Sequence, residues 1–399
     1  MMTDDWTALR QPIVQQFIQE HEGKDSYQLA LQAKKHPNIP VQLVAQQIQA
    51  RQKAKSKLSE WYQTQGIIFP SRLAMEQCSS QATAEYKSSL VSGKTAVDLT
   101  GGAGVDTYYL SQSFERADYV EQNPDLAAIA QHNFSQLGTS TIQTHIGDAK
   151  TFLSSANPVD LIYLDPARRD YTNQKVFRLS DCSPNVIQLL PQLLKKAKQV
   201  MIKTSPMLDI NQATQDLGSV QEVHIVVVNN ECKEVLYLLS REVNQPSQIT
   251  AIDLTSSASP LIFTHQEEAE ATAALAEPQQ FIYEPNAAIL KAGAFRTVAQ
   301  RWNVAKLHPN THLYTSEKLV PDFPGRSFRL ETVLPYQKKA VQAHIPGKKA
   351  NITTRNFSDS VATVRKKLGL KEGGNTYLFA TRTMTKERIV LITQKTSNS

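Results

Sequence analysis

Residues 96–107 read AVDLTGGAGVDT. An apolar strand runs here into a glycine-rich turn and then into a helical pattern. The backbone at such a turn can approach a ligand closely and point its N–H groups toward it, which is typical of a nucleotide-like cofactor site. The alternative is that the glycines only permit tight packing between strand and helix.

Three cofactor patterns compete for this turn. A phosphate-binding P-loop requires Gly-Lys-Ser/Thr at its end, which is absent, and the dinucleotide pattern G-x-G-x-x-G meets Thr107 where its third glycine belongs. The third pattern is acid-x-x-x-Gly-x-Gly, which Asp98, Gly102 and Gly104 match. An acid at the strand end suits a cationic ligand, so this pattern favours S-adenosylmethionine, which carries a sulfonium and an amino group.

Two more acids stand at the ends of the next two expected strands. Glu121 closes the strand at 118–121, and Asp148 follows the strand at 142–146. A carboxylate at the first position can hold two ribose hydroxyls, and one at the second can accept a hydrogen bond from an adenine amino group. Each acid singly is typical of an ordinary surface. Three at successive strand ends, where open α/β sheets bind ligands, indicate a cofactor site.

The fourth strand ends in a polar tip, because residues 161–169 read LIYLDPARR. Methyl transfer explains such a tip: the side chain of Asp165 and the backbone carbonyl of Pro166 can accept the hydrogens of a base amine and so orient its lone pair. Arg168 and Arg169 can stack on a base or grip a phosphate. The alternative is a strand-terminating turn with locally paired arginines.

The surrounding pattern predicts an α/β fold. Short apolar runs alternate with helical ones from residue 95 to residue 241, as in a parallel sheet covered on both faces. Further strands are expected at 161–165 and 199–203. Two β-rich runs, at 220–228 and 234–239, follow with no room for a helix between them, so the last strand is expected to be antiparallel.

Composition excludes several classes of protein. The chain has 399 residues, 41% of them hydrophobic and 20% charged, which rules out one small domain and wholesale disorder. Its longest apolar runs are far shorter than the roughly 20 residues of a membrane helix. The start of the chain lacks the pattern of a secretory signal, so a cytoplasmic protein without membrane contact is expected. The three cysteines lack metal-ligand spacing, so neither a disulfide framework nor a metal site is expected.

Positive charge is concentrated at the C-terminus. Residues 321–399 hold 15 Lys and Arg against 5 Asp and Glu, a net charge of +10, while the first 320 residues sum to −4. A localised basic region favours a polyanionic partner such as RNA or DNA. The alternative is an ordinary lysine-rich solvated surface.

These motifs together resemble class I S-adenosylmethionine-dependent methyltransferases. The likeness is strongest to the bacterial group in which an N-terminal helical region and the methyltransferase core precede a ferredoxin-like and a THUMP-like module. The residues that carry it are Glu76–Ser80, Asp98–Gly104, Glu121, Asp148, Asp165–Arg169, Tyr283–Asn286 and Lys371–Gly374.

The resemblance implies a Rossmann-like, seven-stranded sheet with an antiparallel last strand. It implies an N-terminal helical region at 1–88, the methyltransferase domain at 89–245, a linker at 246–279 with a helix near 267–277, and two small α+β modules at 280–325 and 326–395. The cofactor would be S-adenosylmethionine, and THUMP-like modules imply RNA as substrate. The implied site residues are, for the cofactor, Asp98, Thr100, Gly102, Gly104, Glu121 and Asp148, and for the acceptor, Asp165, Pro166 and Arg168.

Two positions depart from the family pattern. Thr100 stands where many methyltransferases have the first glycine of the loop, and Asp-Pro-Ala-Arg replaces the Asn/Asp-Pro-Pro-aromatic tip of amine-methylating enzymes. The aromatic ring that would stack on a flipped base is therefore absent. Cys182 and Lys203 are further candidates for the site, each with a purely structural alternative.

The function expected from the sequence is methylation of a nitrogen or oxygen of an RNA nucleotide in rRNA or tRNA. The alternatives are a methyltransferase acting on a small molecule or a protein, and a non-catalytic RNA-binding protein. The RNA, the atom and the oligomeric state stay open.

Overall fold

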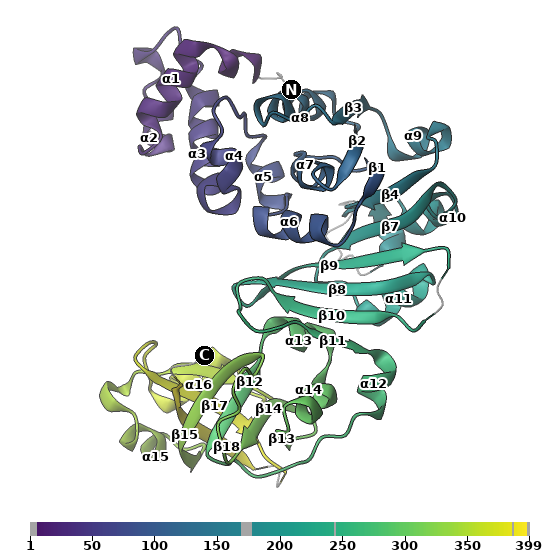
Figure 1. Cartoon of the computed structure of the whole chain (residues 1–399). Helices are drawn as coiled ribbons and strands as arrows, with labels where there is room; N and C mark the ends of the chain where they lie inside the picture. The colour runs from purple at the N-terminus through teal and green to yellow at the C-terminus, as the bar shows by residue number, and fades with distance from the viewer. Residues whose placement is uncertain (1–5, 169–177, 243–244, 385–386, 397–399) are drawn as a thin grey trace. The chain divides into compact units, whose positions relative to one another are not determined.

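The computed structural model describes residues 6–168, 178–242, 245–384 and 387–396. The chain divides into two compact units, one comprising residues 1–220 and 237–243 and the other residues 221–236 and 244–399. Figure 1 traces the helices and strands of both units. The α/β fold class expected from the sequence is confirmed.

The first unit begins with short helices. These are η1 (Trp6–Arg10), α1 (Pro12–His21), α2 (Ser26–Ala30), η2 (Ala33–Lys35), α3 (Val41–Lys57), α4 (Ser59–Gln63), α5 (Arg72–Gln77) and α6 (Gln81–Ser89). Helices α3 and α4 are separate, because Leu58 leaves helical geometry between them. Helix α6 begins after Ser80, which forms a capping box with Thr83.

A mostly parallel sheet follows. Its strands are β1 (Gly93–Asp98), β2 (Phe114–Glu121), β3 (Ile142–Ile146), β4 (Val159–Leu164), β7 (Ala197–Thr204), β8 (Val220–Val228), β9 (Glu231–Ser240), β10 (Gln248–Asp253) and β11 (Leu261–Thr264). In the described chain their order is β11-β10-β8-β9-β7-β4-β1-β2-β3. The neighbours β8 and β9 are joined by Asn229 and Asn230 alone, both with positive φ, so β9 runs antiparallel to β8 as expected.

The sheet extends beyond the seven expected strands. Residues 246–264, interpreted from the sequence as part of a linker, contain β10 and β11, and the expected helix near 267–277 is α12 (His265–Glu270). Strand β10 pairs in parallel with β8 and antiparallel with β11. The sequence of β10 is short and mixes polar with apolar residues, so by itself it does not indicate a strand. Hydrogen bonds to β8 and burial beside it stabilise β10.

Helices cover the parallel strands of the first unit. They are α7 (Val105–Ser111), α8 (Pro124–Gln136), α9 (Ala149–Ser155), α10 (Val186–Lys196) and α11 (Ile210–Leu217). Figure 1 shows α7 and α8 on one side of these strands and α9 and α10 on the other. This cover on both faces explains why consecutive apolar residues are buried in β4 and in the second half of β7.

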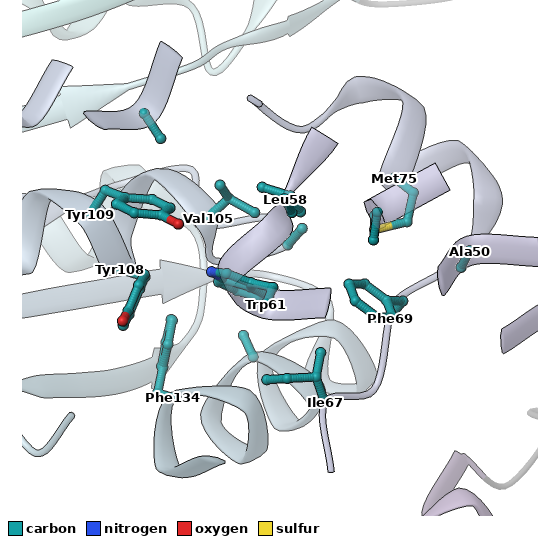
Figure 2. Packing of buried hydrophobic residues seen from close by; sticks show 14 of the residues in the cluster. Ala50, Leu58, Trp61, Ile67, Phe69, Met75, Val105, Tyr108, Tyr109 and Phe134 are labelled. Atoms are coloured by element: carbon teal, nitrogen blue, oxygen red, sulfur yellow. The ribbon is translucent and has the colours of Figure 1, made fainter. Parts of the chain in front are cut away.

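The N-terminal helices share a core with the sheet's own helices. Trp61 of α4 lies edge-on to Tyr108 of α7, with ring centroids 5.8 Å apart, and Phe134 of α8 belongs to the same buried cluster (Figure 2). The carboxylate of Glu60 accepts hydrogen bonds from the hydroxyls of Tyr108 and Tyr109, at 2.8 and 2.7 Å. Residues of α3 to α6 thus pack against α7 and α8, which cover the parallel strands.

The C-terminal part of the second unit is built on another sheet. Its strands are β12 (Phe281–Pro285), β13 (Ala305–His308), β14 (Thr311–Ser316), β15 (Gly325–Pro335), β16 (Asn351–Thr354), β17 (Thr376–Arg382) and β18 (Arg388–Lys395). Its helices are α13 (Ala287–Ala292), α14 (Phe295–Arg301), α15 (Lys338–Ala343), η4 (Pro346–Lys348) and α16 (Val361–Leu368). The alternation matches the two α+β modules expected from the sequence.

These two modules share one sheet, whose order in the described residues is β13-β14-β12-β15-β18-β17-β16. Strand β15 pairs with β12 through its first residues and with β18 through most of its length.

None of the helices in the described residues is long and apolar enough to cross a membrane.

Candidate functional site

The acids singled out in the sequence lie at one edge of the sheet. Strands β1, β2, β3, β4 and β7 pair in parallel, so their carboxyl ends meet at the same edge. Asp98 and Glu121 end β1 and β2, Asp148 follows β3, and Asp165 follows β4. The topology therefore gathers four carboxylates where open α/β sheets bind their ligands.

The glycines of the 101–104 turn differ in what they permit. A side chain at Gly101 would collide with the ring of Tyr119, and one at Gly104 would begin 2.8 Å from Phe134. These two glycines serve packing. Gly102 also has a positive φ of 55°, yet the nearest atom to a β-carbon there would be the Thr100 carbonyl oxygen at 3.6 Å. No neighbouring atom excludes a side chain at position 102, so the positive φ, rather than packing, favours glycine there.

Strand β2 holds both polar groups of Gly102. The carboxylate of Glu121 accepts a hydrogen bond from the Gly102 N–H at 2.9 Å, and the hydroxyl of Tyr119 donates to the Gly102 carbonyl at 2.6 Å. The other Glu121 oxygen accepts from the N–H of Asn123 at 2.8 Å. The turn is thus hydrogen-bonded directly to Glu121, the carboxylate that is expected to hold a ribose.

Asp98 is buried, and its carboxylate is hydrogen-bonded to the residues on either side of the glycine-rich turn. Its two oxygens accept hydrogen bonds from the Thr100 N–H at 2.9 Å and from the Thr107 hydroxyl at 2.6 Å. Burial raises the pKa of Asp98 to about 7, an effect that these hydrogen bonds oppose and the nearby carboxylates of Asp106 and Asp165 reinforce. A cationic ligand beside Asp98 would favour its ionised form.

Asp148 is exposed and caps helix α9. Its carboxylate accepts from both the N–H and the hydroxyl of Thr151, at 2.9 and 2.5 Å, and these bonds lower its pKa. Two residues earlier, Ile146 leaves 65% of its surface exposed at the end of β3. Sequence reasoning missed Ile146, because an apolar strand residue is expected to be buried, whereas Ile146 ends β3, the edge strand of the sheet.

The residues that follow β4 are hydrogen-bonded to the glycine-rich turn. The N–H of Asp165 donates to the hydroxyl of Thr100 at 2.7 Å, and that hydroxyl lies 3.3 Å from an oxygen of Asp98. One carboxylate oxygen of Asp165 lies 2.5 Å from the ammonium of Lys203, which β7 supplies. The side chain of Asp165 is 35% exposed and Pro166 is half-buried, so this end of β4 is open to solvent.

The residues after Pro166 are described only in part. Ala167 and Arg168 form β5 (Ala167–Arg168), which pairs with β6 (Cys182–Ser183) and sets the backbone of Arg168 opposite Cys182. The side chain of Arg168 and all of Arg169 lie outside the described residues. Cys182 is buried and follows η3 (Leu179–Asp181); α10 starts only at Val186, capped by Asn185. We find Cys182 in a short strand rather than at the start of a helix.

Family comparisons match three successive parts of the chain. Residues 93–244 match the family of RNA cap guanine-N2 methyltransferases, residues 281–324 a ferredoxin-like domain, and residues 325–395 a THUMP domain-like family. The last two matches meet at the first residue of β15, which lies in the THUMP-like match and pairs with β12 of the ferredoxin-like match.

Whole-chain comparisons agree with these matches. The chain is 33% identical to the crystallised candidate methyltransferase of Porphyromonas gingivalis W83, with full coverage of both chains and a TM-score of 0.86. It is also 21% identical, over 69% of its length and 74% of theirs, to the uncharacterized S-adenosylmethionine-dependent methyltransferases MT3122 and Rv3037c of two Mycobacterium tuberculosis strains.

Proposed function

This chain belongs to the family of S-adenosylmethionine-dependent methyltransferases that carry a ferredoxin-like and a THUMP-like module, and we propose that it methylates a nitrogen or oxygen of an RNA nucleotide. The observation that carries the proposal is the hydrogen bond from the Asp165 N–H to Thr100. It holds a half-exposed carboxylate beside the turn that bears the bare backbone of Gly102, so acceptor and cofactor would meet there.

The residues present fit this cofactor. Gly102 leaves backbone accessible, Glu121 offers a carboxylate for ribose hydroxyls, and Asp98 gains its charge when a cation is near. Asp148 and the exposed Ile146 flank the position expected for adenine. S-adenosylmethionine supplies a methyl group on a sulfonium, which is transferred in line and leaves S-adenosylhomocysteine.

The chain's own groups would orient the acceptor and accept its proton. The Asp165 carboxylate and the Pro166 carbonyl are hydrogen-bond acceptors, so they can bind the hydrogens of an amine or a hydroxyl and aim its lone pair. As the acceptor atom forms its bond to the methyl carbon, the proton it gives up can pass to Asp165 or to water. No cysteine nucleophile is needed for a nitrogen or oxygen acceptor.

RNA as the substrate class rests on three observations. The core matches a family of RNA methyltransferases, the C-terminus matches a THUMP-like family, and residues 321–399 carry a net charge of +10. A basic module neutralises phosphates in a sequence-independent way, which would hold RNA while the core selects the atom.

The test compares modified nucleosides. Total RNA from strains with and without the protein is digested and examined by mass spectrometry; we expect one methylated nucleoside to disappear with the protein and to return with the intact gene but not with an Asp165→Ala variant. RNA from the deletion strain then serves as substrate in vitro, with methyl-labelled S-adenosylmethionine. Unchanged nucleosides, together with labelling of protein or small molecules in extracts, would refute RNA as the substrate.

A further inference from the structure

A cluster of buried charges lies behind Asp165. Lys203 of β7, Asp106 of α7 and Lys87 of α6 are each at most 9% exposed, and Ser79, which precedes α6, is 5% exposed. Ser79 belongs to the 76–80 motif, to which the methyl-transfer chemistry assigns no role. All four residues belong to the first unit of the chain.

Ser79 is hydrogen-bonded to each of the three charged residues of the cluster. Its hydroxyl donates to one oxygen of Asp106 at 2.8 Å and accepts from the ammonium groups of Lys87 and Lys203, each at 3.2 Å. Lys87 lies 3.3 Å from the other Asp106 oxygen, and Lys203 lies 3.7 Å from the first. The hydroxyl of Tyr163 also donates to Asp106, at 2.8 Å.

Asp165 contacts this cluster through Lys203 and is partly exposed to solvent. Lys203 reaches Asp165, whose side chain is 35% exposed, whereas the side chains of Lys87 and Asp106 are at most 10% exposed. Burial by itself would raise the pKa of Asp106, but the ammonium groups of Lys87 and Lys203 outweigh it and lower the pKa. Asp106 therefore stays charged and anchors both lysines.

Stability does not account for such a cluster. Burying charges costs desolvation free energy that their attraction only roughly repays, and apolar residues of similar volume often do as well. A fixed cluster does supply orientation: a lysine with partners on both sides can hold a carboxylate in one place. Catalytic geometry is sensitive to this, since a misplacement of about 1 Å can cost about 100-fold in rate.

We infer that Lys203 is a positioning residue that holds the Asp165 carboxylate in the orientation that receives the acceptor, and that Ser79 and Asp106 hold Lys203 in turn. This inference rests on the proposed role of Asp165. It makes the N-terminal helical region part of the active site, because Ser79 and Lys87 precede residue 93, where the match to the methyltransferase family begins.

The experiment compares Lys203→Met, Lys203→Arg and Ser79→Ala with the wild type in the full chain. Labelled methyl transfer to RNA from the deletion strain gives kcat and KM, calorimetry gives the Kd of S-adenosylmethionine, and thermal unfolding reports folding. The matched control is Lys198→Met on the same strand, because Lys198 pairs with Asp160 at 2.6 Å but is 80% exposed. Lys87 is not substituted, since it is fully buried.

We expect Lys203→Met to lower kcat by about 100-fold with the cofactor Kd within twofold, and Lys203→Arg to recover at least part of that loss. Ser79→Ala should lower kcat by a smaller factor, and Lys198→Met should leave kcat unchanged. A kcat within threefold of wild type in Lys203→Met, or a parallel loss of cofactor affinity, would overturn the inference. If Lys203→Met does not fold, wild-type kcat in Ser79→Ala overturns it.

A double substitution separates this inference from the proposed function. If Lys203 acts through Asp165, then Lys203→Met adds no loss of kcat to an Asp165→Asn variant; an additive loss contradicts that. If Asp165→Asn and Asp165→Ala both transfer methyl groups at the wild-type rate, the proposed role of Asp165 itself is wrong. A large loss in the Asp165 variants with none in the Lys203 variants refutes only the inference.

Discussion

The hydroxyl of Thr100 accepts a 2.7 Å hydrogen bond from the backbone N–H of Asp165. The same hydroxyl reaches the buried carboxylate of Asp98 at 3.3 Å. A glycine at position 100, as in many relatives of this fold, could make neither contact. The threonine that departs from the family pattern therefore joins the end of β1 to the end of β4.

Thr100→Val should cost stability and turnover, whereas Thr100→Ser should preserve both. Valine keeps the shape of threonine but leaves the partly buried Asp165 N–H without its acceptor, a loss of about 1–3 kcal/mol in the free energy of unfolding. Urea unfolding of both variants measures it. Equal stability of the valine and serine variants would show that the hydroxyl is dispensable.

Gly102 and Gly104 should respond oppositely to substitution. Gly104→Ala adds a β-carbon 2.8 Å from Phe134 at a φ of 81°, so we expect a loss of about 2–4 kcal/mol in unfolding free energy. Gly102→Arg meets no such neighbour, so it should lose only about 1–2 kcal/mol, which is what a φ of 55° costs a residue with a side chain. It should therefore fold, but it should abolish S-adenosylmethionine binding in calorimetry. Normal cofactor affinity in folded Gly102→Arg would contradict the assignment of this turn to the cofactor.

Cofactor affinity should rise with pH and level off only above pH 7. The pKa of Asp98 is raised to about 7 in the ligand-free protein, so below that pH the carboxyl is mostly protonated, and binding of a cation must expel the proton. Calorimetry at pH 6 in buffers of different ionisation enthalpy should detect proton release. Asp98→Asn should abolish that release; an unchanged release would assign the proton to another group.

The raised pKa of Asp98 also makes the stability of the folded protein depend on pH. Because the folded protein holds the Asp98 proton more tightly than the unfolded chain, whose ordinary pKa is 3.8, this group's contribution to the free energy of unfolding falls as pH rises from about 4 to about 7. Urea unfolding of wild type and Asp98→Asn across this range isolates the contribution, which should be missing from the asparagine variant.

Three exposed lysines should contribute to RNA binding. Backbone hydrogen bonds join the Lys348–Lys349 segment to Lys371, namely Lys371 N–H to the Lys348 carbonyl at 2.7 Å and Ala350 N–H to the Lys371 carbonyl at 3.0 Å. Replacing all three by glutamine should lower the salt dependence of binding, with a change in slope of about 0.7 per lost phosphate contact on single strands.

The matched control for that variant replaces Lys24, Lys34 and Lys35, which are equally exposed but lie in the N-terminal region. Filter binding to total RNA at several salt concentrations measures both triple variants. Equal slopes for the two would indicate that net charge, rather than this part of the THUMP-like module, governs binding.

Glu284 should be a structural residue of the C-terminal unit. Its carboxylate is 3% exposed and pairs with Arg355 at 2.7 Å and with Arg326, on β15. Glu284→Gln leaves two cations without their anion, and because both arginines are about one third exposed we expect a loss of about 2 kcal/mol rather than the 3–5 of a fully buried pair. Urea unfolding tests this against the exposed control Glu331→Gln, and the Kd of S-adenosylmethionine should not change.

Local patterns in the sequence were sufficient for most of the fold. Strands β3 and β8 occupy the residues expected, and the acids that follow successive strands point to one edge because parallel pairing leaves no other arrangement. Strands β10 and β11 escaped notice because each is only a few residues long, and its stability comes from a neighbouring strand rather than from its own periodicity.

What the order of residues determined for this protein is the cofactor turn and the succession of acids, since both follow from periodicity and turn chemistry within short windows. Only the tertiary structure decided which polar groups meet. Ser79 and Lys203 are 124 residues apart, and their contact depends on a helix and a strand being packed together. Local patterns describe how each element forms, whereas the orientation of Asp165 depends on side chains brought together by the packing of the whole unit.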